Sequence, residues 1–140
     1  MILVRNYKDD DYPEIEALYH SPNSFGGRFD SARDSFERLE KLSQAKPGSI
    51  LVAEHKGKIV GCVTIFEDGR SAWLYLFAIQ NGANDEIAQA LWNAAKDILK
   101  QMGHSQVLVY APSGDSSFEE RYIHLGFLKG ADYTAFWQDV

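Results

Sequence analysis

The chain has 140 residues, of which 45% are apolar, and it carries a formal net charge of −6. This length and apolar content exclude a disordered chain and fit a single domain over residues 1–140. The acidic balance argues against a nucleic-acid surface, which normally needs a basic face. No segment approaches the roughly 20 apolar residues that span a bilayer, and the first residues are too polar for a signal peptide. We therefore expect a cytoplasmic protein.

The first predicted elements are a short strand at residues 2–5 and a helix that begins near Pro13. Three aspartates at positions 9–11 precede this helix. We favour helix capping over a metal site for this triplet, because carboxylates satisfy free N–H groups at the positive end of a helix. Residues 21–30 are predicted to form a loop, and residues 31–44 a second helix.

Residues 50–80 are predicted to form an antiparallel meander of three strands. Apolar runs at 50–54 and 59–66 flank a hairpin turn, and a third run follows at 73–79. Cys62 lies inside the second strand, and we interpret it as a small core residue rather than a nucleophile.

The run from Trp73 to Ile79 is the centre of the predicted fold. It is followed by a turn, by apolar residues at helical spacing from Ile87 to Met102, and by another strand at 106–110. A strand, a helix and a strand with short joints form a βαβ unit, whose two strands are parallel neighbours. Ligands of such units bind where strand ends meet helix N-termini, so we expect functional residues between 80 and 90.

The last part of the chain predicts a short helix at 116–124, which Gly126 ends, and strands at 127–128 and 132–137. The final strand should pair back on its neighbour, and its aromatic side chains serve either a homodimer or the core. The complete order of elements indicates an α/β (α+β) domain with a mixed sheet.

This order resembles the GNAT superfamily of acetyl-CoA-dependent N-acetyltransferases. Three stretches carry the resemblance: LVR at 3–5 before the acidic helix start, LVAEHKGKIVG at 51–61, and YIHLGF at 122–127. The resemblance covers nearly the whole chain. It implies a mostly antiparallel sheet with a central splayed parallel strand pair, and about four helices. It also implies transfer of an acetyl group from acetyl-CoA to a primary amine of a small molecule or a protein.

The cofactor loop departs from the family pattern. The family has Gln/Arg-x-x-Gly-x-Gly/Ala at the start of the central helix, where backbone amides bind the pyrophosphate of coenzyme A. The corresponding residues are Ala83, Asn84, Asp85, Glu86, Ile87 and Ala88, of which only Ala88 fits. A carboxylate and a phosphate about 5 Å apart, at an effective dielectric of about 20, repel each other by about 3 kcal/mol before screening.

The same residues are also an ordinary helix start, with Asn84 as the N-cap and two acids in the first turn. Two hypotheses therefore stay open. The chain is either an N-acetyltransferase with a divergent cofactor loop, or a catalytically degenerate GNAT-fold domain that binds a metabolite or a protein.

The resemblance also implies roles for other residues. Tyr122 matches the general acid of the family, because a phenol can protonate a departing thiolate, although packing on Phe118 is the alternative. The pantetheine arm would lie beside Phe77, Ala78 and Ile79, with an N–H group near Ala78 or Ile79 facing the developing oxyanion. Asp115 lies near a position that contacts the pantetheine in the family.

The sequence leaves the general base and the acceptor open. Glu54 and Glu67 lie on strands beside the central one, but their facing is not fixed by the pattern. The four histidines are scattered in surface-like positions and lack the spacing of metal ligands. Residues 20–45 would shape the acceptor pocket, and their mixed composition fits either a small-molecule or a protein amine.

Overall fold

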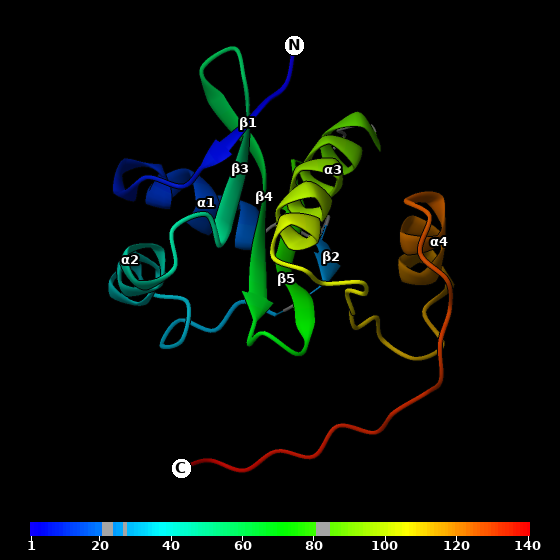
Figure 1. The fold of residues 1–140 in the computed structure, drawn as a ribbon. Helices are drawn as coiled ribbons and strands as arrows, with labels where there is room; N and C mark the ends of the chain where they lie inside the picture. Colours follow the sequence, from blue (N-terminus) through cyan, green and yellow to red (C-terminus); the bar gives the residue numbers. More distant parts are fainter. Residues whose placement is uncertain (21–23, 27, 81–84) are drawn as a thin grey trace.

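The structure is a computed structural model that describes residues 1–20, 24–26, 28–80 and 85–140 (Figure 1). Its elements are β1 (Leu3–Asn6), the 3-10 turn η1 (Asp9–Asp11), α1 (Tyr12–Tyr19), β2 (Ser24–Gly26), α2 (Phe36–Ala45), β3 (Ile50–His55), β4 (Lys58–Glu67), β5 (Ala72–Ile79), α3 (Asp85–Gln101) and α4 (Ser116–His124). The five strands form one sheet in the order β1-β3-β4-β5-β2, and all of these pairs are antiparallel. The mixed α/β fold with a mostly antiparallel sheet and four helices is therefore confirmed.

Helices cover both faces of the sheet. On one face α3 buries Leu91 completely, and on the other face Ile15 of α1 and Leu39 of α2 are buried. Gly61 of β4 allows the close approach of α3, because a Cβ atom there would lie 2.8 Å from Cγ2 of Ile87. The N-terminus of α3 is thereby held against the middle of the sheet.

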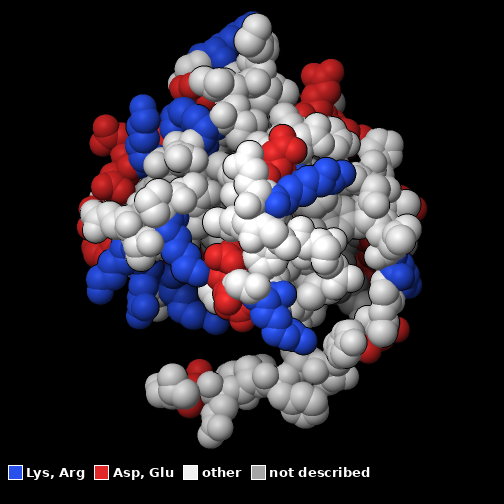
Figure 2. Space-filling view, in the orientation of Figure 1, with Lys and Arg blue, Asp and Glu red and all other residues white. Residues whose placement is uncertain are grey.

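The surface carries both signs of charge. Acidic and basic side chains are interspersed over the face shown in Figure 2, and lysines and arginines gather over α2. The longest helix, α3, has 17 residues and includes several charged ones. In the part of the chain that the structure describes, no helix has the length and apolar character needed to cross a membrane.

The predicted strand at 106–110 pairs with β5 at a single parallel bridge. The N–H of Leu108 donates to the carbonyl of Ala72 (2.9 Å), and the N–H of Leu74 donates to the carbonyl of Leu108 (3.1 Å). No further ladder pairs follow among the described residues, so the parallel pairing is limited to this bridge. The splay of the pair that the resemblance implies stays a prediction.

The α1–α2 connection differs from the prediction. Residues 21–30 were expected to be a loop, but β2 pairs with β5 inside this range. The second helix begins at Phe36 rather than at residue 31, because the carboxylate of Asp30 accepts from the N–H groups of Ala32 and Arg33 (3.0 and 2.9 Å) and holds a turn. Ser35 then caps α2 by accepting from the N–H of Arg38 (3.4 Å).

The strands predicted at 127–128 and 132–137 do not form. Residues 128–140, here called the arm, run as an extended segment away from the body (Figure 1). Phe127 is held, because its N–H donates to the carbonyl of Tyr122 (3.0 Å) and its ring lies 4.7 Å from that of Trp92. A strand needs a partner edge, and the described residues place none beside the arm.

The acidic start of α1 has a structural role. The carboxylate of Asp11 is buried and accepts from both terminal nitrogens of Arg5 (2.8 and 3.0 Å) and from the N–H of Lys8 (2.8 Å). Burial opposes its ionisation, but the hydrogen bonds from Arg5 and Lys8 hold the pKa of Asp11 below its usual value. The ion pair therefore fixes the β1–α1 connection.

We expect Asp11→Ala to lower the free energy of unfolding by about 1–3 kcal/mol, because Arg5 and the Lys8 N–H lose a partly buried partner. Urea denaturation at neutral pH measures the effect. The stabilisation is present above the unfolded pKa of aspartate and is lost as the pH falls through the lowered pKa of Asp11. Asp10→Ala is the matched control, since Asp10 is exposed; equal urea midpoints for the two variants would contradict the role of Asp11.

Candidate functional site

The ladder between β4 and β5 is interrupted near the middle of β5. Thr64 pairs with Tyr75, but Cys62 pairs with Ala78, so β5 contains one extra residue. Leu76 lies at this β-bulge and has a φ of +47°, in the left-handed region that side chains rarely adopt. Leu76 is nevertheless buried, and Cys62 Sγ lies 3.8 Å from its carbonyl oxygen. The bulge therefore changes the direction of β5 at a point where its side chains are packed.

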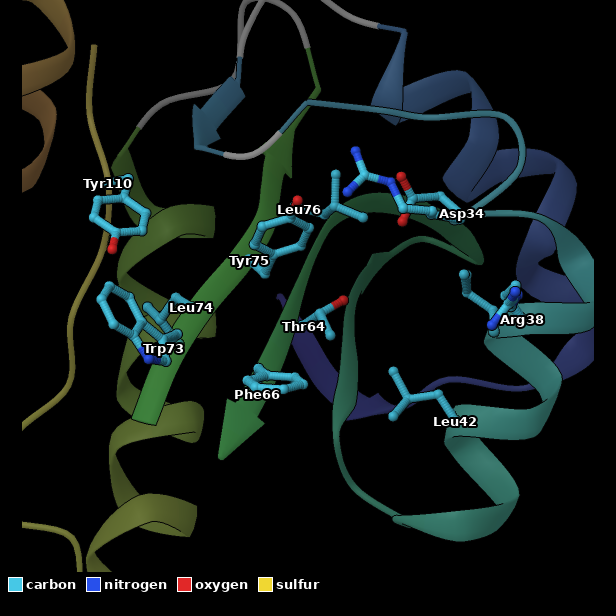
Figure 3. Close-up of a pocket in the computed structure, with 12 residues that line it drawn as sticks. Asp34, Arg38, Leu42, Thr64, Phe66, Trp73, Leu74, Tyr75, Leu76 and Tyr110 are labelled. Atoms are coloured by element: carbon cyan, nitrogen blue, oxygen red, sulfur yellow. The ribbon is translucent and has the colours of Figure 1, made fainter. Parts of the chain in front are cut away.

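A pocket of about 540 Å³ opens beside the bulge (Figure 3). Its walls come from α2 and the turn before it, from β4 and β5, and from the segment 106–110. Aromatic rings dominate one wall, where Trp73 and Tyr110 lie 4.7 Å apart between ring centroids. The lining residues are Arg33, Asp34, Arg38, Leu39, Leu42, Thr64, Phe66, Trp73, Leu74, Tyr75, Leu76 and Tyr110.

Asp34 is the acidic residue of this pocket. It is buried, one of its carboxylate oxygens accepts from the N–H of Asp30 (2.8 Å), and burial raises its pKa. The hydroxyl of Tyr12 donates to the backbone carbonyl of Asp34 (2.9 Å), which fixes the turn before α2. Asp34 was not among the site residues predicted from the sequence. A carboxylate between Arg33 and Arg38, in the segment expected to shape the acceptor pocket, was the available signal.

Tyr122 lies on α4 and is buried. Its ring meets that of Phe127 edge-to-face at 5.4 Å, and it belongs to the same apolar cluster as Phe77 of β5. Burial raises the pKa of the Tyr122 phenol, so the side chain keeps its proton at neutral pH. Phe118 packs against the same apolar cluster. The catalytic role of Tyr122 and its alternative, packing on Phe118, both stay predictions.

Asp115 is the N-cap of α4. Its carboxylate accepts from the hydroxyl of Ser117 (2.6 Å) and from the N–H groups of Ser117 (3.1 Å) and Phe118 (3.3 Å). These bonds, first that from the Ser117 hydroxyl, lower the pKa of Asp115. The structure thus gives Asp115 a capping role, and its predicted contact with a cofactor is not tested by it.

The other residues predicted to bind the cofactor lie around the junction of β5 and α3. Phe77, Ala78 and Ile79 are buried at the end of β5. Two of the other predicted positions, Ala83 and Asn84, lie outside the described residues. Asp85 and Glu86 are exposed in the first turn of α3, whereas Ile87 and Ala88 of the same helix are buried.

Two contacts at this junction bear on ligand binding. β2 pairs with β5 at Phe77 and Ala78, on the edge of β5 opposite β4, which is also the edge that Leu108 joins. At the tip of α3, Asp85 lies 3.0 Å from Nε2 of His124, which links α3 to the end of α4. A ligand entering between β5 and α4 therefore meets β2 and this contact between Asp85 and His124.

The glutamates considered as bases have partners away from the pocket. Glu54 lies 3.6 Å from Arg5, and Glu67 lies 2.9 Å from Nε2 of His104. The bond with His104 lowers the pKa of Glu67. His104 was predicted to lie at the surface, but its side chain is only 6% exposed, because the Glu67 carboxylate holds it against the sheet. The described ranges contain no group of three His, Cys, Asp or Glu side chains that could hold a metal ion.

Comparisons with known proteins agree with this architecture. The sequence matches the Acetyltransferase (GNAT) family over residues 6–127. No curated protein sequence matches the chain. An aminoglycoside 6′-N-acetyltransferase, AAC(6′)-Ih from Acinetobacter baumannii, has a similar structure, with a TM-score of 0.73, 13% identity, and coverage of 100% of this chain and 99% of that one.

Two further structures show the same fold. Rv2747 from Mycobacterium tuberculosis, solved in complex with CoA and NLQ, matches with a TM-score of 0.64 and 20% identity, over 95% of this chain and 76% of that one. A structure from Pyrococcus horikoshii matches 87% of this chain with a TM-score of 0.63 and 15% identity, and this chain spans 42% of its length. Since the family match runs from Asn6, at the end of β1, through α4 to Phe127, the chain belongs to the GNAT acetyltransferase family.

Proposed function

We propose that the chain transfers an acetyl group from acetyl-CoA to a primary amine of a small molecule or a protein. The observation that carries the proposal is the pocket beside the bulge of β5, because it adjoins the parallel strand pair of a family of acyltransferases. Related structures support the two reactants separately. One similar protein is an aminoglycoside N-acetyltransferase, and another is bound to CoA.

The cofactor would bind along the end of β5. Phe77, Ala78 and Ile79 offer backbone groups on the edge opposite β4, and this edge leads to the N-terminus of α3. β2 now pairs with that edge, so it has to leave before a pantetheine arm can take its place. β2 has three residues and an irregular register, so few interactions oppose this exchange.

The acceptor would bind in the pocket. Phe66, Trp73 and Tyr110 provide apolar surface for its carbon skeleton, and Asp34 provides a base. Bound acetyl-CoA supplies the acetyl thioester. Asp34 would accept a proton from the ammonium group of the acceptor, and the raised pKa that burial gives this carboxylate suits the role. The neutral amine could then attack the thioester carbonyl, forming the amide C–N bond as the C–S bond breaks and the thiolate leaves. Tyr122, which holds its proton at neutral pH, donates it to the departing thiolate.

A catalytically degenerate binding domain is the second candidate function. Two observations favour it: the carboxylates of Asp85 and Glu86 in the first turn of α3, and the pairing of β2 with the edge that a cofactor needs. In that case the pocket beside the bulge would hold a metabolite or a peptide side chain without acetyl transfer.

Isothermal titration calorimetry with acetyl-CoA tests the proposal. We expect a dissociation constant in the micromolar range. Glu86→Gln should tighten binding several-fold at low salt, because one carboxylate is removed near the cofactor's phosphates, and this gain should fade at high salt. Absence of heat at millimolar acetyl-CoA, for both proteins, would remove the enzymatic function and leave the binding domain.

Replacing the phenol tests the general acid. We expect Tyr122→Phe to lower kcat by about 10²-fold while the affinity for acetyl-CoA is unchanged, since the ring remains and the proton donor is lost. The assay follows free thiol release with an amine acceptor. Tyr7→Phe is the matched control, because Tyr7 is also buried and its hydroxyl has no hydrogen-bond partner among the described residues. Equal activity of the two variants would leave Tyr122 with a packing role.

The pH dependence tests the base. Asp34 acts when deprotonated, so kcat/KM of the unmodified protein should rise with pH through the raised pKa of this carboxyl group. We expect Asp34→Asn to lower kcat/KM by about 10²-fold and to remove the rise that comes from the Asp34 carboxyl group. A separate rise, caused by deprotonation of the free amine substrate, should persist in the variant. Exposed Asp10→Asn is the control. A variant with the same pH profile as the unmodified protein would exclude Asp34 as the base.

A further inference from the structure

One wall of the pocket beside the bulge carries opposite charges that do not pair with each other. Asp34, Arg33 and Arg38 line this wall, and Figure 3 shows Asp34 and Arg38 on the side formed by α2 and the turn before it. Within the described ranges no ion pair joins Asp34 to either arginine. Arg33 pairs with Asp30 instead (3.6 Å). Asp34 and Arg38 therefore remain as one carboxylate and one guanidinium for the charged groups of a ligand.

Both of these side chains keep binding capacity. Asp34 is only 8% exposed, and its Oδ2 accepts from the N–H of Asp30 (2.8 Å). In the part of the chain that the structure describes, no donor reaches its Oδ1. Arg38 is exposed and, among the same residues, its guanidinium has no ion pair or hydrogen bond. An open carboxylate oxygen can accept from an ammonium group, and a guanidinium presents a fork of N–H donors that matches a carboxylate.

The opposite wall of the pocket is aromatic. Trp73 and Tyr110 lie across the pocket from Asp34 and Arg38 in Figure 3, with Tyr75 and Phe66 on the strands between them. Phe66 is 60% and Tyr110 66% exposed, so their rings are open to a ligand. Covering such rings with an apolar group is favourable, and a ligand ring gains further when it packs at a centroid distance of about 4.5–7 Å.

We propose that the pocket binds a free α-amino acid with a large apolar side chain, and that this amino acid is the acetyl acceptor. Its ammonium group would donate to Oδ1 of Asp34, and its carboxylate would accept from the guanidinium of Arg38. In an α-amino acid these two groups share one carbon atom, so both reach one wall while the side chain extends toward Trp73 and Tyr110. The pocket volume of about 540 Å³ is that of a small-molecule site.

Other classes of amine match these groups less well. A plain apolar amine would bind Asp34 and the aromatic wall but would leave Arg38 without a partner. A polycationic amine, such as an aminoglycoside, would bring several ammonium groups toward Arg38 with a single carboxylate to bind them. A zwitterion with an apolar side chain satisfies the carboxylate, the guanidinium and the aromatic wall together.

The proposed step forms the amide C–N bond at the α-nitrogen and breaks the thioester C–S bond. The ammonium group loses two protons. One passes to Asp34 and then to solvent, and the other replaces the proton that Tyr122 gives to the thiolate. The products are the N-acetyl amino acid, free coenzyme A and one proton. The role as acceptor rests on the proposed acetyl transfer, whereas binding of the amino acid does not.

Titration calorimetry of the full chain with L-phenylalanine, phenethylamine and 3-phenylpropionate tests the binding without acetyl-CoA. Phenethylamine lacks the carboxylate and 3-phenylpropionate lacks the amine, while all three share the phenyl ring. We expect L-phenylalanine to bind about tenfold more tightly than either analogue, because each analogue loses one charge-assisted contact. Equal or tighter binding of either analogue or of the aminoglycoside kanamycin, or no heat from L-phenylalanine at millimolar concentration, would overturn the proposal.

Replacing the guanidinium tests the contact with the carboxylate. We expect Arg38→Gln to remove the roughly tenfold preference for L-phenylalanine over phenethylamine. Lys41→Gln is the matched control, because Lys41 is an exposed cation on the same helix and does not line the pocket. It should keep the preference, and circular dichroism checks that both variants are folded. A preference that survives in Arg38→Gln would contradict the proposed contact.

An acetylation assay separates this inference from the proposed function. We expect kcat/KM for L-phenylalanine to exceed that for phenethylamine by about tenfold, with free thiol release as the readout. If L-phenylalanine binds but none of the amines is acetylated, acetyl transfer fails and the amino-acid site stands. If phenethylamine or kanamycin is acetylated faster than L-phenylalanine, acetyl transfer stands and the amino-acid acceptor is overturned.

Discussion

The extra residue in β5 is the constraint on which the site depends. A regular ladder would keep β5 straight beside β4, with its side chains alternating between the two helix layers. The bulge instead places Leu76 in a left-handed conformation, which costs about 1–2 kcal/mol for a residue with a side chain. Leu76 and the following Phe77 are both buried, so packing offsets this cost. The strand thereby turns from the pocket wall at Tyr75 into the core at Ala78.

This turn also determines what can lie along the free edge of β5. Before the bulge, the edge accepts Leu108 in a parallel bridge, and after it the edge accepts β2. Two segments from distant parts of the sequence thus share one edge without forming a continuous ladder. The same geometry leaves room for a pocket between α2, Trp73 and Tyr110. Fold and site therefore have a common cause in the interrupted pairing of β4 with β5.

Much of this fold was predictable from local patterns. The meander from Ile50 to Ile79 has long apolar runs and clear turns, and α3 and α4 have helical spacing with recognisable ends. The position of Tyr122 relative to Gly126 followed from the family resemblance. The meander and the two helices depend on residues close in sequence, which is why the local pattern identified them.

The features that the sequence did not predict depend on tertiary contacts. β2 contains glycine and serine and becomes a strand because β5 offers an edge. The bulge has no local signature, since leucine rather than glycine occupies the left-handed position. Asp34 joins a pocket whose other walls come from β4, β5 and Tyr110, and the His104 side chain is held by its contact with Glu67. In each case the structure depends on a contact with another part of the fold, which the local sequence pattern does not contain.

The edge beside Phe77 and Ala78 is also where the two candidate functions separate. β2 makes few backbone hydrogen bonds with β5. When β2 leaves this edge, bonds to water replace them, at a net cost of about 1 kcal/mol for each bond. A cofactor that replaces them regains the hydrogen bonds but brings its phosphates toward Asp85 and Glu86. At the same tip, Nε2 of His124 lies 3.0 Å from the carboxylate of Asp85. Acetyl transfer therefore requires that backbone pairing and pantetheine packing together outweigh the carboxylates at the tip of α3, and a binding domain results where they do not.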